Sequence, residues 1–269
     1  MSTELHPAAA ESTAPEPAST ARAVTRTAIP TQSRTAERSS RASTTAPTPG
    51  VHTLNPFRWS QRTGALVSGS ALAAMVPLSI FGYFIAFKGL VTTGDATKTA
   101  DAISASPLLW FAGIASLFAV VVLDIVAAAG WFALFRPVNH IVSSVAAATR
   151  AVYGVIFAVA IGQLVVAFTQ LNEPLAALGS TEAFWTIWQA SLGLFGIALL
   201  IAAWLAYRSG FVPRILGILL GIAGIGYIAD LIGLTFVDGF APTFGLFGFV
   251  GETAIIVWLL IRGRRLPRS

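Results

Sequence analysis

Six long apolar stretches occupy residues 64–262, and each is long enough to cross a lipid bilayer as a helix. A hydrocarbon core of about 30 Å needs about 20 apolar residues at about 1.5 Å rise per residue. Only 11% of the residues are charged, against about 25% in a typical soluble domain. The sequence therefore predicts an all-α fold, a polytopic transmembrane helical bundle of six helices. We place the spans at 65–87, 108–135, 143–169, 184–207, 214–236 and 243–262.

Positive charge alternates along the segments that flank and connect these stretches. Every second segment carries arginine: Arg58, Arg62, Arg136, Arg208, Arg214, Arg262, Arg264, Arg265 and Arg268. The segments between them are neutral or acidic, and in the first of these Asp95 and Asp101 balance Lys88 and Lys98. Basic residues near the end of a span resist translocation. We therefore expect a multi-pass protein of the bacterial cytoplasmic membrane with both termini in the cytoplasm.

The first 55 residues differ in composition from the rest of the chain. Ala, Thr, Ser, Pro and Arg dominate residues 1–55, which contain almost no large apolar side chain. Such a segment cannot bury enough surface to offset the entropy of ordering it. The sequence predicts a disordered cytoplasmic tail over 1–55, a transmembrane domain over 56–263 and a short basic cytoplasmic end over 264–269.

The residues that usually hold metals and cofactors are missing from the predicted spans. The chain has no cysteine, and His6, His52 and His140 all lie outside the spans. Thiolate, zinc and haem sites therefore lack their usual ligands there, so we expect no cofactor, no metal and no enzymatic activity. We attribute the net charge of +5 to membrane topology and anionic lipid, with the bilayer as partner and no nucleic acid.

Four ionisable residues lie inside the spans: Asp124, Arg150, Asp230 and Glu252. Each costs about 2.5–3.5 kcal/mol in hydrocarbon on insertion scales, so all four should face the interior of the bundle. Counted from the span ends, Asp124, Arg150 and Glu252 lie at overlapping depths. We predict an Asp124–Arg150 ion pair between neighbouring helices, with Glu252 close by. The alternative is an ion pair that only fixes helix register.

Three carboxyl groups face one guanidinium group, so two acids remain unpaired at membrane depth. A carboxyl group that gains and loses a proton there is what a proton-coupled carrier needs. Asp230 lies nearer the outer surface, where it can equally reach water. The sequence suggests a transporter-like protein for a small-molecule or proton ligand. The alternative is a non-transporting membrane sensor, chaperone or assembly protein, in which the buried charges fix helix packing.

Neutral polar residues and glycines complete the candidate set. We expect Gln163 and Gln189 each to hydrogen-bond a neighbouring helix; lining a polar cavity is the alternative. Small residues let helices approach closely, and we predict that five glycines of the last two spans pack those spans together, with dimerisation into an oligomer as the alternative: Gly217, Gly221, Gly245, Gly248 and Gly251. In the first outer loop, Asp95 is expected to cap a short helix ending at Ala105.

An ordered set of short motifs resembles a known family. In chain order these are Gly94-Asp95, Asp124, Arg136-Pro137-Val138-Asn139, Arg150, Ser209-Gly210-Phe211-Val212-Pro213-Arg214-Ile215-Leu216-Gly217, Gly226-Tyr227-Ile228-Ala229-Asp230 and Gly251-Glu252. Together they resemble the bacterial domain of unknown function 4386 (DUF 4386) family of integral membrane proteins, over about residues 60–263. The resemblance implies a six-helix-type membrane protein, and it supplies no assigned activity and no catalytic residues.

Overall fold

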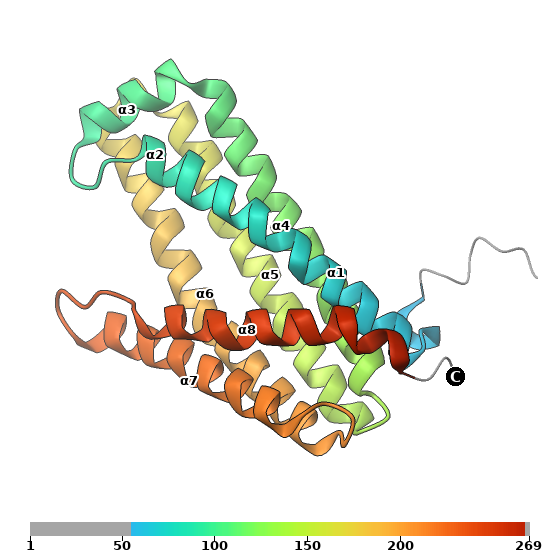
Figure 1. The fold of residues 1–269 in the computed structure, drawn as a ribbon. Coiled ribbons are helices and arrows are strands. Elements are labelled where there is room, and N and C mark those ends of the chain that lie inside the picture. Colours follow the sequence, from blue (N-terminus) through green and yellow to red (C-terminus); the bar gives the residue numbers. More distant parts are fainter. Residues whose placement is uncertain (1–54, 267–269) are drawn as a thin grey trace, which may run out of the picture. The chain divides into compact units, whose positions relative to one another are not determined.

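A computed structural model describes residues 55–266, and every regular element in that range is helical (Figure 1). Of the tail predicted for 1–55, only residue 55 lies within the described residues. Of the basic end predicted for 264–269, only residues 264–266 do. The elements, in chain order, are η1 Pro56–Arg58, α1 Gln61–Ser79, η2 Ile80–Phe87, α2 Lys88–Leu90, α3 Ala96–Ala105, α4 Pro107–Phe135, α5 His140–Thr169, α6 Pro174–Arg208, α7 Arg214–Phe236, α8 Phe244–Ile261 and η3 Gly263–Arg265.

Five of the described helices are long and apolar enough to cross a membrane. The first of them, Gln61–Leu90, is continuous through α1, the π-helix η2 and α2, and the others are α4, α5, α6 and α7. Large apolar side chains such as Phe84, Val122 and Ile225 are exposed on these helices, as expected for surfaces that face lipid. The all-α fold and the multi-pass membrane character are therefore confirmed. The sixth predicted span corresponds to α8, which has 18 residues and is not among the five.

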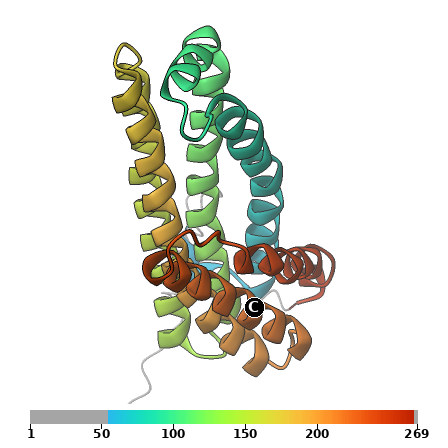
Figure 2. The same cartoon turned by 90° about the vertical axis from the view of Figure 1, so that its left-hand side faces the viewer.

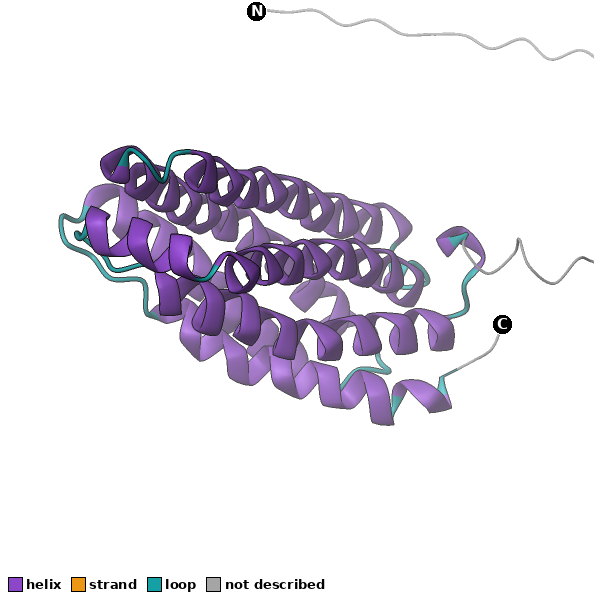
Figure 3. Ribbon diagram, turned by 90° about the horizontal axis from the view of Figure 1, so that it is seen from above, coloured by secondary structure: helices purple, strands orange, loops and turns teal. Residues whose placement is uncertain are grey.

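Helices that follow one another in sequence pack side by side, from α4 through α8, and α1 packs against both α4 and α8 (Figures 1 and 3). The hairpin of α7 and α8 runs obliquely to α4, α5 and α6 (Figures 1 and 2). Short connections explain this order, because two helices joined by a short loop are held side by side and pack as antiparallel neighbours. This packing brings α4, α5, α7 and α8 around one buried region.

The largest difference from the predicted spans is the start of α6, which begins at Pro174 where the sequence suggested residue 184. Ala177, Thr181 and Phe184 are buried, and this spacing places them on one helix face. The short helix α3 packs against α6, so an extra length of helix finds an apolar partner. Glu182, which precedes the predicted span 184–207, therefore lies on α6 and not in a loop.

The short helix expected in the first outer loop is present. The carboxylate of Asp95 accepts a hydrogen bond from the backbone N–H of Lys98 at 3.0 Å, which satisfies one free donor of the α3 N-terminus. Ala100 and Ile103, which face the same side, are buried. The loop packs against α4 and α6 through α3, at the end of the bundle away from the Arg136 loop (Figure 1).

Candidate functional site

The predicted ion pair between Asp124 and Arg150 is present. The Nη2 of Arg150 on α5 donates to Oδ1 of Asp124 on α4 at 2.5 Å, and the two side chains are 4% and 2% exposed. The short loop between α4 and α5 makes these helices antiparallel neighbours, which brings the two residues to one depth. Among the described residues, Nε of Arg150 and Oδ2 of Asp124 have no hydrogen-bond partner. The pair is thus held by one hydrogen-bonded contact, and buried polar atoms on both sides stay without a partner.

Two aromatic rings enclose the guanidinium group of Arg150. Its Cζ lies 5.4 Å from the ring centre of Trp131 on α4 and 5.0 Å from that of Phe195 on α6. An aromatic face attracts a cation through its quadrupole, most strongly when water is excluded. The arginine is therefore stabilised by one carboxylate and two rings contributed by two different helices. Neither ring could be assigned to the site from the sequence, because aromatic residues are common in apolar spans.

Glu252 lies close to the pair, as expected, but it does not form an ion pair with Arg150. Both residues line one small cavity of about 20 Å³, whose walls are otherwise aliphatic and aromatic: Leu72, Trp131, Phe195, Leu199, Leu220, Ile255 and Ile256. One water molecule needs about 10–15 Å³ of such volume. The cavity has room for about one water molecule, and no solute fits between these side chains in this conformation.

Tyr227 supplies the direct partner of Glu252. Its hydroxyl group on α7 donates to Oε1 of Glu252 on α8 at 2.9 Å. A phenol donor stabilises a partly buried carboxyl group without adding charge. The tyrosine falls within a motif of the family resemblance, yet nothing in its spacing indicated that it would meet Glu252, because α7 and α8 contribute one residue each.

Asp230 has a different role from the other intramembrane acids. Its Oδ1 accepts hydrogen bonds from the backbone N–H groups of Thr243 and Phe244 at 2.9 and 3.0 Å, and its Oδ2 accepts one from Gly245 at 2.6 Å. The first N–H groups of a helix have no partner within the helix, and a carboxylate there is also favoured by the helix dipole. Asp230 is 7% exposed and does not line the cavity beside Arg150. Asp230 therefore caps α8. It is not exposed to water, and it does not belong to the group of charged residues around Arg150.

The two glutamines do not make the expected interhelical contacts. Gln189 is 7% exposed and Gln163 is partly exposed, and within residues 55–266 neither side chain hydrogen-bonds a neighbouring helix. Aromatic rings account for the contact between α5 and α6 in this region, where Phe157 stacks on Trp188 with ring centres 5.3 Å apart. The helices are held there by apolar packing, which leaves the amide groups without a facing partner.

The predicted glycine packing is correct for one set and wrong for the other. A Cβ added at Gly245, Gly248 or Gly251 of α8 would meet α7 within 3.0 Å, so this row packs α7 against α8 as expected. At Gly217 a Cβ would lie 2.9 Å from the backbone nitrogen of Tyr207, and Gly221 faces Ala203. Both contacts lie on α6, because the short loop after α6 turns this face of α7 back onto it. Both sets of glycines are therefore covered within one chain.

Comparison with known proteins agrees with the helical pattern. Residues 67–263 match the family described as "Domain of unknown function (DUF4386)". The chain is also 34% identical over 153 residues to an "Uncharacterized protein" of Archaeoglobus fulgidus, an alignment that covers 57% of this chain and 85% of that relative. No solved structure matches the chain. Because the match extends from α1 to the end of α8 and includes the buried charges and their partners, the chain belongs to the DUF4386 family.

Proposed function

We propose that this protein crosses the bacterial cytoplasmic membrane six times, with α8 as the sixth span and both termini in the cytoplasm. Arg136 donates a hydrogen bond to the carbonyl oxygen of Trp59 at 2.9 Å, and Gly263 packs against Ala65. These contacts bring three of the arginine-bearing segments to one end of the bundle. A single basic end supports the proposed orientation, with the bilayer as partner and no nucleic acid.

Within this topology, we propose that the buried charges serve a transporter-like protein for protons or a small solute, without enzymatic activity. The observation that carries the proposal is the unequal charge near Arg150: this residue forms an ion pair with Asp124 and lines one cavity together with Glu252, a second acid. The carboxylate of Asp230 is occupied at the α8 N-terminus. A carboxyl group at membrane depth that loses and recovers a proton can couple this exchange to a conformational change.

Uptake into proteoliposomes tests this proposal. We expect an inward proton gradient to drive uptake of at least one compound from a panel of small solutes, or of protons alone as followed by a pH-sensitive dye. Glu252→Gln should reduce that flux about ten-fold or more, as is typical when a proton-transfer group is lost. Asp238→Asn, which changes an exposed acid, is the matched control and should keep the flux. A flux equal to that of protein-free vesicles, or one unaffected by Glu252→Gln and Asp124→Asn, would contradict the proposal.

One observation favours the second candidate, a non-transporting sensor, chaperone or assembly protein. The cavity beside Arg150 has only about 20 Å³, whereas sites for drug-sized ligands have about 300–1,000 Å³. If the pair only fixes helix register, replacing Asp124 and Arg150 together by apolar residues of similar volume should leave all measured functions intact. Retention of a specific membrane partner by that double variant would support the second candidate.

A further inference from the structure

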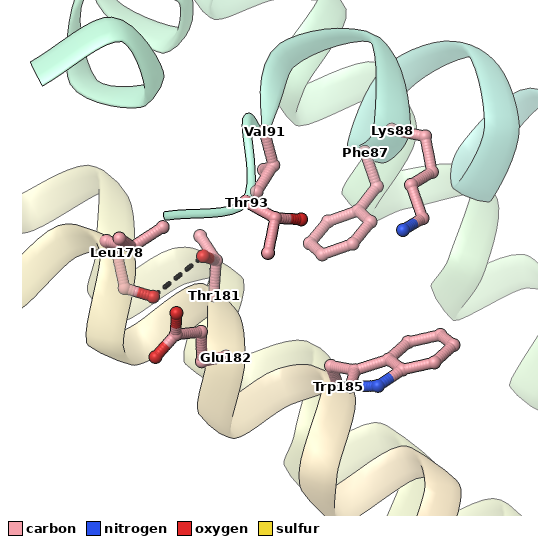
Figure 4. A pocket seen from close by; sticks show the side chains of 8 residues that line it. All are labelled: Phe87, Lys88, Val91, Thr93, Leu178, Thr181, Glu182 and Trp185. Carbon is pink, nitrogen blue, oxygen red and sulfur yellow. Dashed lines mark hydrogen bonds between the residues drawn. The ribbon is translucent and has the colours of Figure 1, made fainter. Parts of the chain in front are cut away.

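A second pocket, of about 130 Å³, lies between the end of the first long helix and the first turns of α6 (Figure 4). It shares no lining residue with the cavity beside Arg150, and it is formed by Phe87, Lys88, Val91, Thr93, Leu178, Thr181, Glu182 and Trp185. Lys88 and Glu182 belong to two different segments between the predicted spans, one after residue 87 and one before residue 184. The extended α6 brings them to one pocket.

Lys88 provides the cation of this pocket and is held by aromatic rings. Its Nζ lies 5.4 Å from the ring centre of Trp185 and 5.8 Å from that of Tyr83. These contacts position the ammonium group but do not use its N–H donors, and none of the carboxylates in residues 55–266 forms an ion pair with it. Lys88 is exposed, so its donors are available to an anionic group that enters the pocket.

Glu182 provides the anion and lies at the opposite end of the pocket from Lys88 in Figure 4. The hydroxyl group of the adjacent Thr181 donates to the carbonyl oxygen of Leu178 at 2.7 Å, so it does not satisfy the carboxylate. Glu182 is exposed and has no ion-pair partner among the described residues. The ring of Phe87 lies between the two charges in this view and gives the pocket an apolar wall.

From this arrangement we propose that the pocket binds a compact zwitterion, with its anionic oxygen group at Lys88 and its ammonium group at Glu182. Two opposite charges held apart by an aromatic wall match a ligand that carries both charges, since an ion of one sign leaves one protein charge unpaired. The volume is below that of drug-sized ligand sites, which favours a small ligand. The same chemistry occurs in water-soluble zwitterions and in zwitterionic lipid headgroups. This proposal is independent of proton coupling.

Binding to the purified full-length protein in phosphatidylglycerol nanodiscs tests the proposal by calorimetry. The probe is glycerophosphoethanolamine, which carries a phosphate and an ammonium group, compared with glycerol phosphate and with ethylammonium. We expect binding of the zwitterion and at least ten-fold weaker binding of each single-charge probe. Lys88→Gln and Glu182→Gln should each weaken zwitterion binding about ten-fold or more, as for a lost hydrogen bond to a charged group.

The control variants Lys98→Gln and Glu173→Gln remove exposed charges of the neighbouring outer segments that do not line the pocket, and they should bind like the wild type. The charge-exchanged double variant Lys88→Glu with Glu182→Lys should recover part of the affinity, because a zwitterion can bind in the reverse direction. No binding, or equal binding by Lys88→Gln, Glu182→Gln and the wild type, would overturn the proposal.

A further arm separates the two sources of the ligand. If a lipid headgroup occupies the pocket, nanodiscs that contain phosphatidylethanolamine should abolish glycerophosphoethanolamine binding, and this lipid should co-purify with the wild type but not with Lys88→Gln. If the source is a water-soluble zwitterion, binding should be unchanged by phosphatidylethanolamine. Either result supports the zwitterion pocket.

Discussion

Individual acids in this bundle differ by the partner that each one finds. Asp124 accepts from a guanidinium group, Glu252 from a phenol, and Asp230 from three backbone N–H groups. The first partner adds a positive charge, the second adds none, and the third belongs to the positive end of a helix dipole. The three carboxyl groups therefore have three different roles: Asp124 forms an ion pair, Glu252 forms a hydrogen bond with a phenol, and Asp230 caps a helix.

Removing the α8 cap should destabilise the protein. Asp230→Ala leaves three N–H groups at the α8 N-terminus without their acceptor, and we expect a loss of about 1.5–3 kcal/mol, the range for hydrogen bonds to a charged group. Thermal unfolding of the purified protein in detergent measures this loss. Asp238→Ala, which removes an exposed acid from the same loop, should leave the melting temperature unchanged. Equal melting temperatures for the two variants would contradict the capping role.

Removing one partner of the buried ion pair should destabilise the protein more than removing both partners. Asp124→Asn leaves the guanidinium group of Arg150 buried without its counter-charge, and we expect a loss of about 3–5 kcal/mol. Asp124→Leu combined with Arg150→Met removes both charges and should recover most of that stability. The same unfolding measurement compares the two variants, with Asp101→Asn on the exposed side of α3 as the control. If the double variant is less stable than Asp124→Asn, the charges themselves contribute the stability.

At the scale of helices, close backbone contacts at glycine join α1 to α4 and α6 to α7. A Cβ at Gly64 would lie 2.6 Å from the carbonyl oxygen of Gly130, and the reverse distance is 2.7 Å. Gly196 and Gly224 approach each other in the same way, with 2.7 Å in both directions. Where lipid removes the hydrophobic drive for association, helices depend on such close packing. These contacts position the α4 and α6 residues that surround Arg150.

A methyl group at one of these crossings should separate the helices. We expect Gly130→Ala to lower stability by about 1–3 kcal/mol, because overpacking forces backbone shifts. Gly162→Ala is the matched control: this helical glycine has no atom within 4 Å of an added Cβ, so the higher helix propensity of alanine should leave stability equal or improved. Melting temperatures in detergent distinguish the two. A stable Gly130→Ala variant would show that the crossing has spare room.

Across the whole bundle, three of the arginine-bearing segments and the pocket lined by Lys88 and Glu182 lie at opposite ends (Figure 1). Contacts of Arg136 with Trp59 and of Gly263 with Ala65 join the basic segments at one end. Lys88, near the C-terminal end of the helix Gln61–Leu90, and Glu182, in the first turns of α6, lie at the other end (Figure 1). Arg150 and Glu252, with the cavity of about 20 Å³ that they line, lie on helices that run between these ends.

Because the chain contains no cysteine, single cysteines can report the orientation. We expect Thr97→Cys on α3 to react with a membrane-impermeant maleimide in intact cells, and His140→Cys at the start of α5 to react only after the membrane is opened. Both positions are exposed, so accessibility to the reagent depends on the side of the membrane. Labelling of His140→Cys in intact cells, with Thr97→Cys protected, would reverse the proposed topology.

The sequence alone was sufficient for the features that depend on local composition and on distance along a helix. The bilayer thickness determines how long an apolar stretch must be, and the predicted span 214–236 coincides with α7 Arg214–Phe236. Asp124 and Arg150 could be paired because a short loop makes α4 and α5 neighbours and both residues lie at similar depth. Asp95 could be identified as a cap because its acceptor and the N–H of Lys98 are three residues apart.

Only the tertiary structure determined the other contacts between helices, which depend on the path of a longer loop or on the rotation of a helix about its axis. Asp230 reaches N–H groups 13–15 residues later, a contact set by the path of the loop between α7 and α8. The side of α7 that bears Gly217 packs on α6, since helix rotation follows from the combined packing of all neighbours. The same packing leaves room for about one water molecule beside Arg150 and brings Lys88 and Glu182 to one pocket, because the space between side chains depends on their three-dimensional arrangement.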